Sequence, residues 1–329
     1  MNPRDSLVAR VRAFVDADLA GKAGPESFEV LASALHAYQA TMCPIRKTMP
    51  VGPFARAADV PAVPTGLFRR LPVGTCGLDA PVQFHTSGTT GPKPGVHRLW
   101  DTALLDHAAR GDALRSLPAV PRRGVALLRD PAKDPHSSLS HMVSTLFGET
   151  SWHLGSDLDV LGLRRAVETA SEPLFVATTG FSLAAWLAEP VPHLPSGSVL
   201  MVTGGFKGRM LNIDPDRLLD EAAKRLRPDH VVREYGMTEL SSMGWSGTRG
   251  PYRLPGWLRA VAVSPLDGTP RPDGERGQLR FVDLCNVDGS VAIETMDVGV
   301  AGPGWVELEG RLPGAELRGC SLAAEDLVR

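Results

Sequence analysis

The chain has 329 residues, of which 43% are hydrophobic and 22% are charged, and its formal net charge is -2 at pH 7. A chain of this length can bury a large core and is expected to contain more than one packed unit. Lysine and arginine are spread along the sequence, which argues against nucleic acid as a partner, and no apolar run is long enough to span a membrane.

The N-terminus and the cysteines predict a cytoplasmic protein. Residues 1–6 carry charged side chains and lack the apolar segment of a secretory signal peptide. The four cysteines are widely spaced and form no CxxC pair, so a zinc site is not expected and a reducing compartment is favoured. Three of them, Cys43, Cys76 and Cys285, are expected to be packing residues.

The first half of the chain shows two changes of pattern. Residues 6–42 predict two amphipathic helices, because apolar side chains recur every three or four positions. Residues 44–75 are rich in proline and glycine and predict an extended segment that lies over the surface. From residue 81 to about 245, short apolar runs alternate with helical patterns. This alternation predicts a mostly parallel sheet with helices on its faces.

Within that region the expected strands are 125–128, 174–178, 199–203 and 230–233, and the expected helices are 157–170, 181–188 and 215–226. After residue 250 the pattern changes to short alternating runs such as 278–282 and 305–309, which predict a smaller β-rich portion. We therefore expect an α/β protein with a nucleotide-binding core over 1–245 and a β-rich portion over 246–329.

Residues 84–95, Phe-His-Thr-Ser-Gly-Thr-Thr-Gly-Pro-Lys-Pro-Gly, are typical of a phosphate-binding loop. Glycines let backbone N–H groups approach an anion, and hydroxyls donate further hydrogen bonds to phosphate oxygens. The spacing is not that of a Walker loop. An apolar-periodic segment from Leu99 follows, so a strand–loop–helix unit is expected. The predicted phosphate contacts are Thr86, Ser87, Gly88, Thr89, Thr90 and Gly91, followed by the cation Lys93. The alternative is a polar turn without a ligand.

Residues 203–208 and 233–239 each follow an apolar strand, and ligands of open α/β sheets bind at such strand ends. In the second segment, Tyr235 offers a ring for stacking on a base, Thr238 a hydroxyl, and Glu239 an oxygen ligand for magnesium. In the first, Gly204 and Gly205 are candidates for the lining of the adenine pocket and Phe206 for a pocket wall. Glycine turns after strands explain either segment equally well when it is taken alone.

These segments resemble motifs of the adenylate-forming superfamily, which contains acyl-CoA synthetases, adenylation domains and firefly luciferase. The resemblance is carried, in the family's order, by Thr-Ser-Gly-Thr-Thr-Gly, Tyr-Gly-x-Thr-Glu, Thr295-Met-Asp-Val-Gly299 and Gly310-Arg311. It implies activation of a carboxylic acid with ATP and Mg2+ to give an acyl adenylate and pyrophosphate. It implies that Tyr235 and Gly236 contact adenine, that Thr238 and Glu239 serve the α-phosphate and the metal, and that Asp297 and Arg311 bind the ribose. His141 is a substrate candidate by the same resemblance, whereas Phe206 is one from its place after the strand.

The sequence departs from the superfamily pattern in three places. Lys93 comes one residue early, and Met296 replaces a glycine before Asp297. The chain ends soon after Arg311, so the mobile C-terminal domain of the superfamily is expected to be absent. These departures keep open a different class of function, a nucleotide-binding scaffold without catalysis.

Nearly the whole chain resembles the acyl-protein synthetases of bacterial bioluminescence operons, for example at residues 37–39, 60–68, 137–143 and 203–208. That branch forms an acyl thioester on a cysteine near its C-terminus, which would be Cys320, and delivers the acyl group to a reductase or carrier protein. Arg318 lies beside Cys320, and a neighbouring cation lowers the pKa of a thiol. The alternatives are an inert cysteine, and adenylation of a small aryl or heterocyclic acid in antibiotic biosynthesis, with transfer to a partner's thiol.

Overall fold

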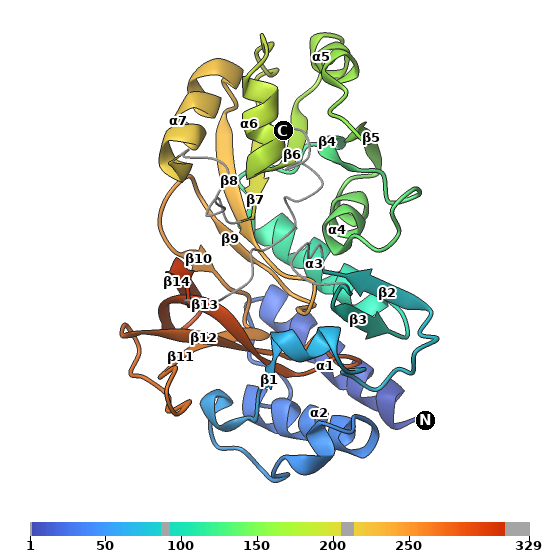
Figure 1. The fold of residues 1–329 in the computed structure, drawn as a ribbon, viewed down its shortest axis with the longest axis vertical. Helices are drawn as coiled ribbons and strands as arrows, with labels where there is room; N and C mark the ends of the chain where they lie inside the picture. The colour runs from blue at the N-terminus through green and yellow to red at the C-terminus, as the bar shows by residue number, and fades with distance from the viewer. Residues whose placement is uncertain (1, 87–92, 205–213, 313–329) are drawn as a thin grey trace.

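The structure is a computed structural model that describes residues 2–86, 93–204 and 214–312 (Figure 1). Its dominant element is a 12-stranded sheet with the strand order β11-β12-β13-β14-β10-β9-β8-β7-β6-β4-β5, to which β1 adds beside β13. The parallel part of this sheet contains β4 (Arg123–Arg129), β5 (Glu149–Leu154), β6 (Leu174–Thr179), β7 (Val199–Thr203) and β8 (His230–Tyr235).

Helices cover both faces of the parallel strands, which explains why β6 and β7 are buried at every position. One face packs against α5 (Val160–Glu168), α6 (Gly180–Leu187) and α7 (Pro215–Leu226), and the other against α3 (Ala103–Ser116) and α4 (Ser138–Leu146). The predicted α/β class is therefore confirmed. The described residues contain no helix that is long and apolar enough to cross a bilayer.

The rest of the sheet is antiparallel apart from the short β1. Its strands are β9 (Gly244–Ser246), β10 (Tyr252–Arg253), β14 (Trp305–Arg311), β13 (Ala292–Gly302), β12 (Arg276–Asp283) and β11 (Leu258–Val263), and β1 (Val63–Pro64) pairs with β13 in parallel. This is the β-rich portion that the sequence predicts after residue 250. The predicted boundary at residue 245 falls inside β9, and the two-unit division stays a prediction.

The two N-terminal helices, α1 (Pro3–Leu19) and α2 (Phe28–Met42), pack against β12 and the loop that joins it to β13. Figure 1 shows both helices at the lower end of the molecule, away from α6 and α7. The proline-rich segment that follows contains the short 3-10 helices η1 (Arg46–Thr48), η2 (Ala57–Asp59) and η3 (Thr65–Arg69). Its extended character was expected, whereas these single turns were not.

The expected strand–loop–helix unit around the phosphate motif is wrong. Instead, β2 (Val82–His85) and β3 (Val96–Leu99) form an antiparallel hairpin, and α3 begins only at Ala103. The residues of β3 are alternately half-buried and buried, with His97 and Leu99 inside, which is the period of a strand. The apolar-periodic segment that begins at Leu99 thus contains the end of this strand, a turn and the helix.

Arg46 of η1 is a fully buried charged side chain. Its Nη2 donates to Ser290 Oγ at 2.7 Å and to Ala292 O at 3.0 Å, and its Nη1 donates to Nδ1 of His36. Because a guanidinium cannot accept, Nδ1 of His36 carries the lone pair, and Nε2 donates its proton to Pro50 O at 3.1 Å. The neutral ring is therefore built into the contact between α2 and its neighbours.

This contact predicts an acid-sensitive fold. Burial and the charge of Arg46 lower the pKa of His36 to about 4, against 6.5 for a free histidine. Between these pH values the unfolded chain binds a proton that the folded chain does not. The free energy of unfolding should therefore fall as the pH drops through this window, by on the order of 3 kcal/mol. Urea denaturation across this range should show a shallower fall for His36→Gln, with His193→Gln at an exposed position as the control. An equally steep fall in His36→Gln would contradict the assignment.

Candidate functional site

Hydrogen bonds at the end of the β2–β3 hairpin join the two ends of the predicted phosphate loop. Thr86 N–H donates to Gly95 O at 2.8 Å, and Gly95 N–H donates to Thr86 Oγ1 at 2.8 Å. The Thr86 hydroxyl keeps its own proton, which remains a possible donor to a phosphate oxygen. Lys93 is exposed just before β3. The other predicted loop contacts, Ser87, Gly88, Thr89, Thr90 and Gly91, lie outside the described residues.

The carboxyl ends of β7 and β8 lie side by side near this hairpin. Thr203 and Glu234 are neighbours in the parallel register, and the Thr203 hydroxyl donates to the Glu234 carboxylate. A Cβ on Gly236 would lie 2.4 Å from Glu234 Oε1, so the carboxylate in its present position lies against a glycine. Gly204 has φ +87°, a left-handed conformation that favours glycine. Gly205 and Phe206 lie outside the described residues.

A pocket of about 50 Å³ opens at these strand ends. Its floor includes Thr203 and Glu234, and its walls are mainly apolar, with Phe84, Leu105, Met142 and Met237 among the lining residues. Methionine side chains adapt their shape readily, so this lining can adjust to an apolar ligand. The volume as it stands has room for a few water molecules.

His141 lies beside this pocket and is not among its lining residues. It projects from α4, its Nε2 lies 2.7 Å from Asp106 Oδ1 on α3, and its ring contacts Phe84 with the centroids 5.2 Å apart. His141 therefore supports the pocket wall through Phe84. A direct contact between His141 and a substrate stays a prediction.

Tyr235, Asp297 and Arg311 come from three strands and meet at one carboxylate. The Tyr235 hydroxyl donates to Asp297 Oδ2 at 2.8 Å, and Arg311 Nε donates to Asp297 Oδ1 at 3.1 Å. Asp297 and Arg311 also face each other in the register of β13 and β14. Asp297 and Tyr235 are each 4% exposed. A carboxylate oxygen can accept more than one hydrogen bond, which is the chemistry that binding of ribose hydroxyls requires.

The segment after β8 forms a turn that several buried groups hold in place. Asp283 accepts from Ser241 N at 2.9 Å, Ser242 Oγ at 2.7 Å and Cys285 N at 3.0 Å. Burial raises the pKa of Asp283 to about 6, and these three donors favour the charged carboxylate. The turn therefore has a fixed shape next to the predicted metal ligand Glu239.

Thr238 and Glu239 lie at the start of this turn. Thr238 is 7% exposed and its Oγ1 lies 3.5 Å from His85 O, while Glu239 is half-buried. His97 and Asn286, which belong to none of the sequence motifs, contact the backbone carbonyls of this pair. Within the described ranges, no three His, Cys, Asp or Glu side chains gather as a metal site.

The Tyr235–Asp297–Arg311 contact gives a first test of the nucleotide site. If Asp297 accepts from the ribose hydroxyls, Asp297→Asn should weaken ATP binding by about 1–3 kcal/mol, because charge-assisted hydrogen bonds are lost. Calorimetry measures the affinity, and a melting curve verifies the fold. Tyr235→Phe removes only a hydroxyl that binds the same carboxylate, so its effect should be smaller. Unchanged affinity in a folded Asp297→Asn protein would remove Asp297 from the site.

No family model and no curated protein matches this sequence. Solved structures that share its fold include two complexes of one enzyme and one of a second enzyme. The o-succinylbenzoate coenzyme A synthetase MenE from Bacillus subtilis, in complex with ATP and magnesium, has a TM-score of 0.51 at 19% identity over 71% of this chain and 52% of that chain. The same enzyme with its acyl-adenylate intermediate gives 0.51 at 20% identity over 70% and 48%. ATP-bound MatB from Rhodopseudomonas palustris gives 0.50 at 18% identity over 72% and 49%.

At these identities the likeness establishes the fold. The predicted fold is confirmed, because the chain shares the fold of these enzymes. The chain spans about half the length of these matching structures. The narrower resemblance to acyl-protein synthetases stays a prediction.

Proposed function

We propose that this chain activates a carboxylic acid with ATP and Mg2+, forming an acyl adenylate and releasing pyrophosphate. The observation that carries the proposal is the contact of Tyr235 and Arg311 with Asp297, which unites three separate sequence motifs at one carboxylate. The fold adds support, because structures that share it include complexes with ATP, with magnesium and with an acyl adenylate.

The residues present fit a magnesium ion bound together with a nucleotide. Magnesium in such sites is held by one or two carboxylates and by substrate phosphates, so a cage of several protein ligands is not required. Glu239 supplies a half-buried carboxylate at the start of a fixed turn. When bound, the ion would neutralise developing charge on the phosphate oxygens.

In the proposed reaction, the chain's own residues bind and orient the two substrates. Asp297 and Arg311 would hold the ribose, and Tyr235 would fix the Asp297 carboxylate while its ring borders the base. Thr86 and the loop after it would donate hydrogen bonds to the phosphates. A carboxylate oxygen of the acid attacks the α-phosphorus, the bond to the bridging oxygen breaks, and pyrophosphate leaves with that electron pair. Preplaced donors are the main source of rate in such a transfer.

The acid substrate is assigned to the pocket beside Thr203 and Glu234. Its walls contain several methionines and suit an apolar acyl or aryl group. The pocket lies at the ends of β7 and β8, next to the turn that carries Glu239. An acid whose apolar part enters this pocket would present its carboxylate towards the nucleotide.

The activated acyl group would then pass to a thiol, and Cys320 is the proposed acceptor within this chain. Cys320 lies outside the described residues, so its support is the sequence resemblance alone. The sulfur attacks the acyl carbonyl, the bond to the phosphate oxygen breaks, AMP leaves, and the thiol proton passes to solvent. A thioester is a suitable donor for a reductase or a carrier protein.

ATP–pyrophosphate exchange with a panel of fatty, aryl and heterocyclic acids tests the proposal. Exchange that depends on both Mg2+ and a particular acid is expected. An acid preference restricted to aryl or heterocyclic members would favour the antibiotic-type alternative. Nucleotide binding without exchange for any acid would instead favour a scaffold and overturn the proposed activity.

A further inference from the structure

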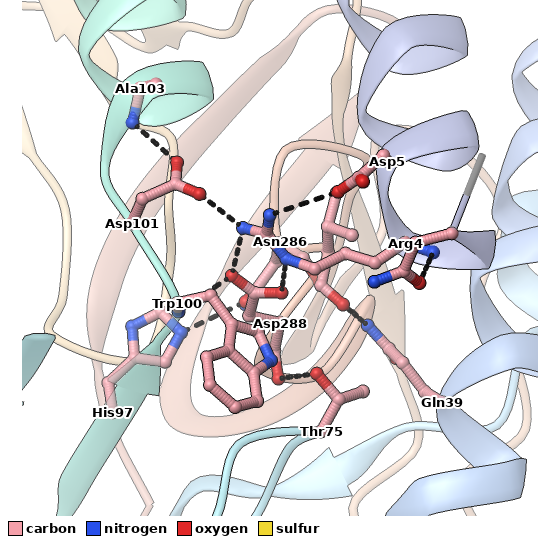
Figure 2. Close-up of polar contacts among 12 residues, drawn as sticks. Arg4, Asp5, Gln39, Thr75, His97, Trp100, Asp101, Ala103, Asn286 and Asp288 are labelled. Carbon is pink, nitrogen blue, oxygen red and sulfur yellow. Dashed lines mark hydrogen bonds and ion pairs between the residues drawn. The ribbon is translucent and has the colours of Figure 1, made fainter. Parts of the chain in front are cut away.

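The backbone of Thr238 and Glu239 is held by two side chains that come from other parts of the fold. His97 of β3 places Nδ1 2.7 Å from Thr238 O. Asn286, in the loop between β12 and β13, donates from Nδ2 to Glu239 O at 2.8 Å. The two side chains also contact each other, with His97 Nε2 3.0 Å from Asn286 Oδ1 (Figure 2). Two successive carbonyls thus each accept a hydrogen bond from one of two side chains that lie in contact.

The pair is enclosed in the protein, which makes its geometry rigid. His97 and Asn286 are both 0% exposed. A carbonyl oxygen only accepts hydrogen bonds, so Nδ1 of His97 carries a proton directed at Thr238 O. Oδ1 of Asn286 also only accepts, so the contact with Nε2 is a hydrogen bond only when the ring carries both protons, and in the neutral ring it is a packing contact. In a site without competing water, such hydrogen bonds are stronger and more directional than at the surface. The turn after β8 cannot move without breaking them.

Gly289 has no side chain, and this leaves room for the side chains of His97 and Asn286. A Cβ at this position would lie 2.3 Å from Asn286 Oδ1 and 2.4 Å from His97 Nε2, closer than real Cβ contacts allow. Gly289 is therefore fitted to the contact between His97 and Asn286. This gives a way to disturb the pair without removing any of its donors or acceptors.

The loop that carries Asn286 is itself fastened to the N-terminal helices. Gln39 of α2 donates from Nε2 to Asn286 O at 2.8 Å and to Val287 O at 3.0 Å. Arg4 of α1 donates to both oxygens of Asp288, at 2.7 Å and 2.8 Å, as Figure 2 shows. Contacts with α1 and α2 therefore fix the loop that carries Asn286. The Asn286 side chain in turn fixes the backbone of Glu239.

We infer that His97 and Asn286 are positioning residues that fix Glu239 for the metal–nucleotide complex. The inference rests on the proposed function, because it assigns the purpose of the pair to the ligand set of that site. Groups that orient a metal ligand from behind commonly change metal affinity or activity by about 10–100-fold when they are lost.

The test measures how much Mg2+ strengthens ATP binding, as the ratio of the calorimetric Kd in EDTA to the Kd with Mg2+. His97→Leu and Gly289→Ala should each lower this ratio by about 10-fold or more and lower the kcat of exchange, while the metal-free Kd stays within about twofold. His97→Asn keeps a donor near the Nδ1 position and should recover part of the loss. His153→Leu, a buried histidine on the edge strand β5, is the matched control for damage to a core.

An unchanged ratio in folded His97→Leu and Gly289→Ala proteins would overturn the positioning role. So would an equal change in His153→Leu, because the effect would then be one of general destabilisation. The natural chain could bind Mg2+ and ATP yet exchange no pyrophosphate with any acid. The proposed activity would then fail, while the ratio of the two Kd values would still test the positioning role. If ATP binding gains nothing from Mg2+, the inference itself is overturned.

Discussion

Replacement of Glu239 by glutamine is expected to lower the kcat of ATP–pyrophosphate exchange by about 100-fold or more. Glutamine has nearly the same shape but lacks the charge that holds a hard cation. A metal contributes several kcal/mol when charge develops on the transferring phosphoryl group, and each 1.36 kcal/mol corresponds to about a tenfold change in rate. The affinity for ATP should change less than kcat, because binding energy realised in the transition state appears in turnover.

Steady-state ATP–pyrophosphate exchange at saturating Mg2+ and ATP gives kcat, and calorimetry gives the nucleotide affinity. Glu221→Gln, at an exposed position on α7, is the matched control for loss of one carboxylate. Equal losses in kcat and affinity for Glu239→Gln would contradict the magnesium role and indicate a binding role. A partial rescue by higher Mg2+ concentrations would support a weakened metal contact.

The parts of the fold with strong local signals could be predicted from the sequence. Helix α7 coincides with the predicted 215–226, because Asp214 caps its N-terminus, Pro215 occupies the first turn, and apolar residues recur on one face. Strands β6 and β7 are short continuous apolar runs, which is the pattern of parallel strands buried on both faces.

Other elements depend on pairing that the local pattern does not reveal. Strand β3 is short and carries His97 and Arg98, so its period of two is hard to distinguish from the helical pattern of α3 that follows. Strand β5 at the edge of the sheet mixes polar and apolar residues, and it is held by its register with β4. Such segments become strands because a neighbour satisfies their backbone, which a single sequence does not show.

The candidate site divides in the same way. The motifs around Tyr235, Asp297 and Arg311 could be found through their resemblance to family motifs in the same order, although their direct contacts could not, since strand pairing decides them. His97 and Asn286 belong to no local motif and lie far apart in the sequence. Their role follows from the loop between β12 and β13, which brings Asn286 to the end of β8.

The strongest expected effect of a single substitution concerns Cys320. If this thiol accepts the acyl group, Cys320→Ser should abolish the covalent acyl adduct that intact-mass measurement detects after incubation with ATP, Mg2+ and a suitable acid. A hydroxyl is a far poorer nucleophile than a thiolate near neutral pH. The same variant should keep ATP–pyrophosphate exchange, because adenylation precedes thiol attack and needs no sulfur.

Two buried cysteines supply the matched controls for this experiment. Burial raises the pKa of Cys76 to about 12, and it raises the pKa of Cys285 well above the usual range, so neither thiol ionises readily at neutral pH. Cys76→Ser and Cys285→Ser should therefore keep the adduct, which hydroxylamine should release as expected for a thioester. If the natural chain makes adenylate yet never gains acyl mass, the acceptor thiol belongs to another molecule. That outcome would leave the adenylation proposal standing and turn the search to a carrier protein, because an acyl adenylate released into water is lost to hydrolysis.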